Sequence, residues 1–484
     1  MQHVPSCRQL GGFALGVALL AAPGLAAAQA LLPSYSGIFP GTGLVTLPGM
    51  TEAQSQMAAS INNVCPSINS VAPGSQLANA CNLMTGTALV VQGQANPLSL
   101  PTLPGITTTA QLKDALTQLD GGAETLVPTN QPSLLRNLQG NAIASRLSVL
   151  HTRMLGGGAA ENDAPSTMLA LGNTAMQSDA PGGIQVAQAA PNEVSLWHDK
   201  LGVYANAIGQ FGDTSTTTSQ NGYDFYNAGF VAGVDYQFTP KITAGVSFGY
   251  TYADTSFDTT PQSAPGQYIH GNLFQGSLYS SWYPTDQLYI DAVGSVGGGD
   301  NTSRRVINVA PLTGVANGSF GSQTYGLALG GGYNIPVGAL TLTPTARFEY
   351  RRVESDAFTE TSGNGLALAY GHSGQNAVLS FFGGQVQYAI STSFGVVVPT
   401  GRFEWAHQYN TGNTALTVAY ANDPTGLSRF SLLGQRPSSD YYDLGAGLAL
   451  QLENNWSGFV NYDAILGVNN TSFNSFTAGF RYTF

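Results

Sequence analysis

The last stretch of the chain decides the fold class. Residues 476–484 read FTAGFRYTF, with an apolar or aromatic residue at every second position. The positions between them are small, polar or charged, namely Thr477, Gly479, Arg481 and Thr483. Because successive side chains of a strand point to opposite faces, the segment predicts one apolar and one polar face. A transmembrane β-barrel needs this pattern, since lipid surrounds it and its lumen is polar.

The same alternation extends upstream to about residue 197. In residues 226–238, Phe230 and Val234 fall on one face, and Asn227 and Asp235 fall on the other. About twelve such segments can be counted, with lengths near the ~9–11 residues that span a bilayer. Short turns alternate with longer polar stretches, as is typical of outer-membrane barrels. Examples are the turns 239–241 and 453–455 and the polar stretches 212–222 and 411–438.

Composition supports a membrane barrel and excludes other classes. The chain has 484 residues, a net charge of −11 and only 9% charged residues, against about 25% in soluble domains. A nucleic-acid binder would need a basic surface, so that class is excluded. A soluble β-sandwich also alternates, but it carries more charge on its outer faces. With 43% hydrophobic residues the chain is not disordered, and it has no apolar run after the N-terminus long enough for a membrane helix.

The N-terminus predicts export. Arg8 precedes an apolar stretch at 11–25 and the small residues 26–28, so residues 1–28 are predicted to be a signal peptide cleaved near Ala28. Two cysteines follow it, Cys65 and Cys81. In an oxidising compartment we expect them to form a local disulfide, and two free thiols are the alternative.

The segment between the signal peptide and the barrel reads as a short helical region. Periodic apolar positions predict helices at 52–64, 111–119 and 132–155. Residues 156–194 are rich in Gly, Ala, Ser and Pro and are predicted to be a linker. The domains expected are therefore a helical region at 29–155, the linker, and a barrel at 195–484.

Several segments resemble the autotransporter β-domain, the translocator of type V secretion. They are YANAIGQFGD, FVAGVDYQF, ARFEYRRVESDAFTE, GRFEWAHQY, YYDLGAGLALQLENNWSGFVNYDA and AGFRYTF. The resemblance implies an outer-membrane barrel of twelve antiparallel strands, with the chain before its first strand threading the pore and an N-terminal passenger delivered to the cell surface. It also implies that the assembly machinery of the outer membrane reads the terminal strand, with Phe480, Tyr482 and Phe484 as its signal. RNLQGNAIASRLSVLHTRMLGGG resembles the segment that precedes such barrels, so 132–155 is a candidate pore helix.

Charge suggests how a pore helix would be held. The segment 132–158 contains Arg136, Arg146 and Arg153 and no acid. We expect these arginines to contact acids that alternate into the lumen, and an exposed, solvated helix is the alternative. The lumen acids are Asp235, Glu349, Asp443, Glu453 and Asp463.

Aromatic residues near strand ends predict an interfacial girdle, with ordinary enrichment of aromatic residues in strands as the alternative. The girdle residues are Trp197, Trp282, Trp405 and Trp456, together with Tyr283 and Phe484.

No motif predicts catalysis, and we expect no enzyme, metal or cofactor. Ser247 lies in a G-x-S-x-G match, but an alternating strand surrounds it and its side chain would face the lumen. The six histidines are scattered, without metal-ligand spacing. Asp356 and Glu360 could form an acid/base pair, although pairing with arginine is the more ordinary role.

The function expected is an outer-membrane autotransporter that translocates or displays its own short N-terminal region. The alternative is a plugged barrel that acts as an adhesin or porin through long extracellular loops, and a membrane-embedded hydrolase is a third. The partners expected are outer-membrane lipid and the barrel assembly machinery, with no nucleic acid. Because one chain supplies all the strands, we expect a monomer.

Overall fold

The computed structural model describes residues 44–121, 200–217, 220–452 and 455–484. The predicted signal peptide, pore helix and linker lie outside these residues, as do Trp197, Glu453 and the arginines Arg136, Arg146 and Arg153. In the part of the chain that is described, no helix combines the length and apolar character needed to cross a bilayer.

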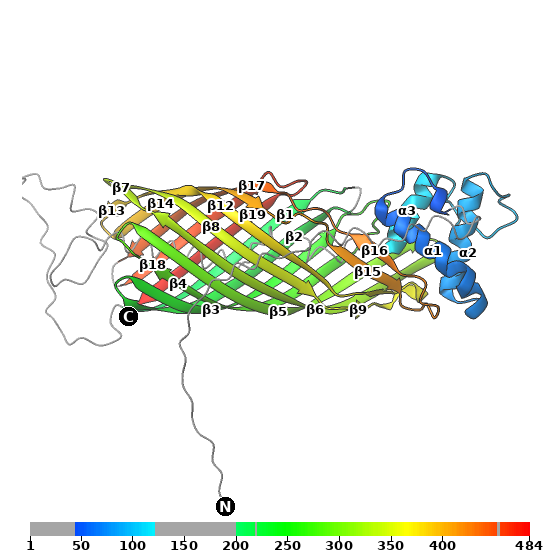
Figure 1. Ribbon diagram of the computed structural model, residues 1–484, viewed down its shortest axis with the longest axis horizontal. Helices are drawn as coiled ribbons and strands as arrows, with labels where there is room; N and C mark the ends of the chain where they lie inside the picture. Colours follow the sequence, from blue (N-terminus) through cyan, green and yellow to red (C-terminus); the bar gives the residue numbers. More distant parts are fainter. Residues whose placement is uncertain (1–43, 122–199, 218–219, 453–454) are drawn as a thin grey trace, which may run out of the picture. The chain divides into compact units, whose positions relative to one another are not determined.

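Twelve antiparallel strands close into a barrel, which confirms the predicted fold class (Figure 1). Each strand pairs with the next long strand along the chain, and the last pairs with the first, where Tyr204 lies opposite Arg481. The strands are β1 (Leu201–Thr214), β2 (Tyr223–Thr239), β3 (Ile242–Phe257), β4 (Tyr268–Trp282), β5 (Leu288–Val309), β6 (Leu312–Tyr333), β8 (Leu340–Ser355), β12 (Ser373–Tyr388), β14 (Gly395–Gln408), β17 (Asp440–Leu452), β18 (Trp456–Leu466) and β19 (Phe473–Thr483).

The two faces of the wall follow the sequence alternation. On β2, Phe230 and Val234 are exposed on the outside, whereas Asn227 and Asp235 are buried on the lumen side. The terminal strand β19 behaves in the same way, with Phe480 outside and Thr477 inside. Each of the twelve described wall strands pairs on both sides, as a bilayer requires, because unpaired backbone groups are not tolerated in hydrocarbon.

The barrel has two unlike ends. At one end, which we call the turn end, short connections such as 240–241 join the strands, and Leu201 and Phe484 meet there through a backbone hydrogen bond of 3.1 Å. Two short strands, β7 (Ile335–Val337) and β13 (Ile390–Thr392), extend the wall at this end. The other end, the loop end, carries the connections β1–β2, β3–β4, β5–β6, β8–β12, β14–β17 and β18–β19.

The loop end is more structured than the sequence predicted. The stretch 411–438, expected to be a polar loop, contains a hairpin of β15 (Ala415–Tyr420) and β16 (Phe430–Leu433). With β11 (Leu368–Tyr370) and β9 (Phe358–Thr359) it forms a separate four-stranded sheet. The connection between β8 and β12, which contains β9 and β11, also contains β10 (Thr361–Ser362) and the 3₁₀ turn η3 (Gly363–Gly365). β10 pairs with β6.

Three helices, preceded by the 3₁₀ turn η1 (Leu44–Thr46), form the described part of the N-terminal region. Capping boxes start α1 (Glu52–Val71) at Thr51 and α3 (Thr109–Asp120) at Thr108, because each threonine and the Gln three residues later satisfy free N–H groups. Both helices are longer than predicted. The sequence reading missed α2 (Gln76–Val91), whose Thr-Gly-Thr centre has weak helix propensity.

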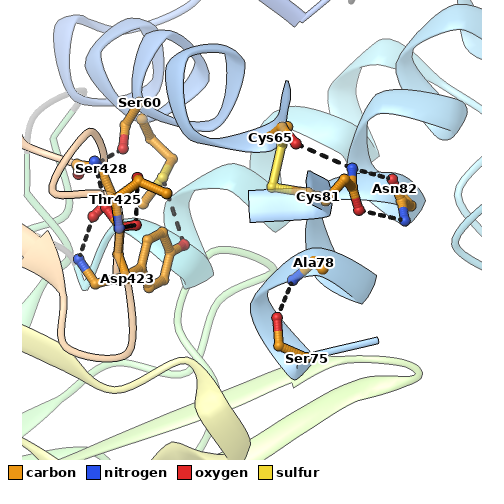
Figure 2. The surroundings of a disulfide bond; sticks show 12 residues. Ser60, Cys65, Ser75, Ala78, Cys81, Asn82, Asp423, Thr425 and Ser428 are labelled. Atoms are coloured by element: carbon orange, nitrogen blue, oxygen red, sulfur yellow. Dashed lines mark hydrogen bonds between the residues drawn. A yellow bond between two sulfur atoms is a disulfide. The ribbon is translucent and has the colours of Figure 1, made fainter. Parts of the chain in front are cut away.

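A disulfide joins the first two helices. Cys65 of α1 and Cys81 of α2 are bonded, with Cα atoms 5.3 Å apart (Figure 2). Two hydrogen bonds between Asn69 and Asn82, of 2.9 and 3.2 Å, lie beside it. A link that closes a loop of this length removes about 3 kcal/mol of unfolded-chain entropy, so it stabilises the helix pair.

Candidate functional site

A network of ion pairs lines one side of the lumen. Arg402 on β14 bonds Asp463 at 2.5 Å, Asp443 at 3.0 Å and Glu404 at 3.2 Å. Arg347 on β8 reaches the same Glu404 at 3.2 Å. Glu349 forms ion pairs with both Arg347 and Arg351. We call these seven side chains of β8, β14, β17 and β18 the salt-bridge belt.

Glycines leave room for the arginine side chains to lie along the inner face of the wall. A β-carbon at Gly445 would lie 3.1 Å from Nε of Arg402 and 2.8 Å from an oxygen of Asp463. Beside the belt, on the next strands β19 and β1, a β-carbon at Gly202 would collide with the guanidinium of Arg481. That arginine bonds Asp235 at 3.3 Å. The ion pairs of Arg402 and Arg481 therefore lie over glycines, where no side chain blocks them.

These pairs reduce the negative charge that the lumen offers to a pore helix. Of the predicted lumen acids that are described, Asp235, Glu349, Asp443 and Asp463 do face inward, but each is bonded to an arginine of the barrel itself. The attraction available to another cation is correspondingly smaller. Sequence reasoning placed the acids on the correct face but missed their arginine partners, which lie on other strands.

The lumen is also not polar along its whole length. Near the loop end, apolar side chains of several strands point inward and form one buried cluster. The polar lumen expected from the alternation rule is therefore wrong for this layer.

The N-terminal helices pack on the loop end of the barrel. One continuous buried cluster joins helix residues such as Met57 and Leu116 to Ile307 of β5, Val418 of β15 and Leu432 of β16. We call this contact between α1–α3, the β5–β6 tip and the four-stranded sheet the docking interface. Burial of this apolar surface stabilises the contact by about 25 cal/mol per Å².

A buried ion pair lies at the centre of the docking interface. Arg305 of β5 donates to both carboxylate oxygens of Glu360, at 2.9 and 2.6 Å. It also donates to the carbonyl oxygens of Leu366, at 2.9 Å, and Gln118 of α3, at 3.4 Å. Glu360 accepts further bonds from the backbone N–H of Leu368 and the hydroxyl of Tyr370. The guanidinium of Arg305 therefore connects α3, through Gln118, to the β8–β12 connection, which contains Glu360 and Leu366.

Further hydrogen bonds join α3 to loops of the barrel. The Gln118 side chain donates to Pro261 O at 2.8 Å and accepts from the backbone N–H of Asn308 at 2.9 Å. Asp114 accepts from Gln262 at 3.0 Å. The helix thus contacts both the β3–β4 connection and the loop end of β5.

The loop between β15 and β16 receives α1. Figure 2 shows Ser60 pointing at Ser428. The Ser60 hydroxyl donates a hydrogen bond of 2.7 Å to the carbonyl oxygen of Ser428. Asp423 shapes this loop through bonds from Thr425 and from the backbone of Ser428. Partial burial alone would raise the pKa of Asp423, but these bonds outweigh it and hold the pKa below its usual value. Burial raises the pKa of the neighbouring Tyr420, with Arg305 opposing the rise.

The predicted girdle residues have different positions. Trp282 ends β4 and Trp456 starts β18, both exposed on the outer wall at the turn end, as is Phe484. Trp405 is exposed nearer the loop end and donates to Asp440 at 3.1 Å. Tyr283 is buried, so its assignment to the girdle is wrong.

Tyrosines near the loop end form a second set that the sequence reading missed. Tyr250 and Tyr462 each donate to an Asn side chain of the next strand, at 2.6 Å, and Tyr350 does so at 3.1 Å. Such rings, apolar with one polar tip, suit the membrane interface. The signal available was a tyrosine at the end of an apolar face.

The residues considered for chemistry have structural surroundings. Ser247 lies on the lumen face of β3 and is buried. Glu360 pairs with Arg305, and the carboxylate of Asp356 lies beside Gly321. Among the described residues, no three of His, Cys, Asp and Glu gather as metal ligands would. On the terminal strand, Phe480 and Phe484 face outward.

A closed barrel with an apolar outer wall and paired charges in its lumen defines a transmembrane β-barrel. The family model described as the autotransporter β-domain matches residues 203–463. The chain belongs to this family of outer-membrane barrels of type V secretion.

Solved structures of the same kind are similar. The translocator domain of autotransporter NalP from Neisseria meningitidis is 17% identical, with a TM-score of 0.47 over 59% of this chain and 90% of that one. The β-domain of the Bordetella autotransporter BrkA is 20% identical, with a TM-score of 0.43 over 59% and 100%. The transport unit of AIDA-I from Escherichia coli is 16% identical, with a TM-score of 0.42 over 61% and 93%. No curated protein matches the chain.

Proposed function

We propose that this chain is an autotransporter that carries its own N-terminal helical region across the outer membrane and displays it docked on its own loops. The docking interface is the observation that supports this proposal. In outer-membrane barrels the short turns face the periplasm and the longer loops face outward. Helices that bind the loop end would then lie on the cell surface.

The positions of the two described chain ends agree with the proposal. Gly121, which ends the helical region, lies against Leu368 and Tyr370 at the loop end. Leu201 begins β1 at the turn end. Gly121 and Leu201 therefore lie at opposite ends of the barrel.

The alternative, an adhesin or porin that works through its long loops, has less support. The apolar side of the β15–β16 hairpin is covered by the chain's own helices, so this face is not free for a ligand. The proposal assigns the chain no enzymatic reaction. We propose outer-membrane lipid and the barrel assembly machinery as its partners. We expect a monomer, because one chain closes the barrel.

An epitope tag inserted after Gln94, in the exposed turn that follows α2, tests the display. We expect protease added to intact cells to remove this tag, because the helices lie outside. A tag inserted after Pro240, in the turn between β2 and β3, is the matched control and should be protected. If the Gln94 tag is removed only after the outer membrane has been broken, the helical region is not displayed and the proposal fails.

A further inference from the structure

A ring of aromatic side chains points into the lumen near the loop end. We choose one ring from each of six strands and call them the apolar collar: Phe225 of β2, Phe257 of β3, Phe320 of β6, Phe381 of β12, Tyr441 of β17 and Phe473 of β19. A seventh ring, Tyr223, lies on the same face of β2 as Phe225. Smaller apolar side chains of β4, β14 and β18 belong to the same buried cluster.

The alternation of each strand places the collar on the inner face. Phe473 shares its face with Thr477, which is buried, whereas Phe476 is half exposed on the outer wall. On β12, Phe381 faces inward, and its neighbour Phe382 is half exposed outside. The collar therefore does not belong to the lipid-facing surface.

The collar is closely packed. Its six side chains are only 2–7% exposed. Ring centroids of Phe225 and Phe473 lie 5.9 Å apart across β1, and those of Phe381 and Tyr441 lie 6.4 Å apart across β14. Contacts at these distances are typical of aromatic pairs in protein interiors.

The collar is bounded by the two layers described above. The guanidinium of Arg347, in the salt-bridge belt, lies 4.1 Å from the centre of the Phe381 ring. At the other boundary, Phe320 stacks on Phe358 at 4.6 Å, and Phe358 stacks on Tyr370 of the docking interface. The lumen thus changes from charged to apolar before it reaches the helices.

We propose that the apolar collar is the permeability barrier of this barrel, which stops ions and small hydrophilic solutes from crossing the lumen. Water wets an apolar constriction poorly, and an ion that enters it loses hydration without gaining polar partners. The salt-bridge belt does not form such a barrier, because its charged side chains can replace part of an ion's hydration shell. This function is independent of whether the helices are displayed, because the collar residues belong to strands of the wall.

Conductance of the full-length protein in planar bilayers tests this inference. Phe381→Ala with Phe473→Ala removes two rings of the collar, and Phe382→Ala with Phe476→Ala removes two rings of the same strands from the outer wall. We expect the unchanged protein and the outer-wall variant to be nearly silent. The collar variant should conduct at least about tenfold more ions per molecule.

Three results would overturn the inference. One is a folded collar variant, checked by its heat-modifiable migration on gels, that is as silent as the unchanged protein. Another is an unchanged protein that already conducts. The third is Arg305→Ala, which loosens the docked helices but keeps the collar, conducting as much as the collar variant, because the helices would then be the barrier. If the double collar variant does not fold, Phe381→Ala and Phe473→Ala made singly provide the same test.

Discussion

Replacing Arg402 with alanine is expected to lower the free energy of unfolding of the barrel by about 3–5 kcal/mol, as happens when one partner of a buried ion pair is removed. Arg402 neutralises Glu404, Asp443 and Asp463, whose side chains are 4%, 1% and 12% exposed. Water cannot replace the guanidinium fully at such sites, so like charges on three neighbouring strands would repel one another. The urea concentration that unfolds the protein in lipid vesicles measures the loss.

Arg352→Ala is the matched control for this experiment. Arg352 also pairs with a carboxylate, that of Glu354, but its side chain is 40% exposed. Exposed pairs contribute about 0–1 kcal/mol, so little change is expected. A loss at Arg402 no larger than that at Arg352 would show that the salt-bridge belt does not stabilise the barrel.

Replacing Arg305 with alanine is expected to loosen the helical region without unfolding the barrel. The change would leave the Glu360 carboxylate, 1% exposed, without its charged partner inside the docking interface. A loss of about 3 kcal/mol there corresponds to opening that is on the order of 100-fold more frequent. Amide hydrogen exchange of α3 should accelerate by that factor, while exchange in β1 and β19 should not.

Two further variants separate charge pairing from other effects. Arg304→Ala changes the neighbouring residue, which bonds the carbonyl of Gly266 instead of the helices, and should leave exchange in α3 unchanged. Arg305→Met combined with Glu360→Gln removes both charges and should recover part of the loss, because no unpaired charge then remains buried. Equal acceleration in Arg304→Ala would contradict the role given to Arg305.

The barrel could be predicted from sequence because its rule is local. Alternation along one strand, as in FTAGFRYTF, already states which side chains face lipid and which face the lumen. Phe480 and Thr477 lie on the faces expected for them. The number of strands follows by counting such segments.

Contacts between distant segments could not be predicted in this way. Arg402 and Asp463 lie 61 positions apart, and only the closed sheet, with Gly445 between them, brings them together. The short strands β15 and β16 bury their apolar side against α1, which lies more than 300 positions away, so the local pattern looked like a polar loop.

The apolar collar escaped prediction for a different reason. Phe473 and Phe381 have the correct alternation to face inward, but the rule that lumen residues are polar made an aromatic at an inward position unexpected. The sequence does show these residues, as aromatic side chains near strand ends at the positions that alternate with the lipid-facing ones. They could not be assigned to one ring without the register of the strands.

Cross-linking on intact cells tests most directly whether the helices are docked outside the membrane. Asp114 of α3 and Gln262 of the β3–β4 loop bond at 3.0 Å, so cysteines at both positions should react with one short bis-maleimide that cannot cross the outer membrane. Cys65 and Cys81 are already bonded to each other and should not compete. We expect the linked peptides, identified by mass spectrometry, in whole cells for Asp114→Cys with Gln262→Cys and not for Asp114→Cys with Lys241→Cys. A link between positions 114 and 262 that forms only after the cells have been broken would contradict the account.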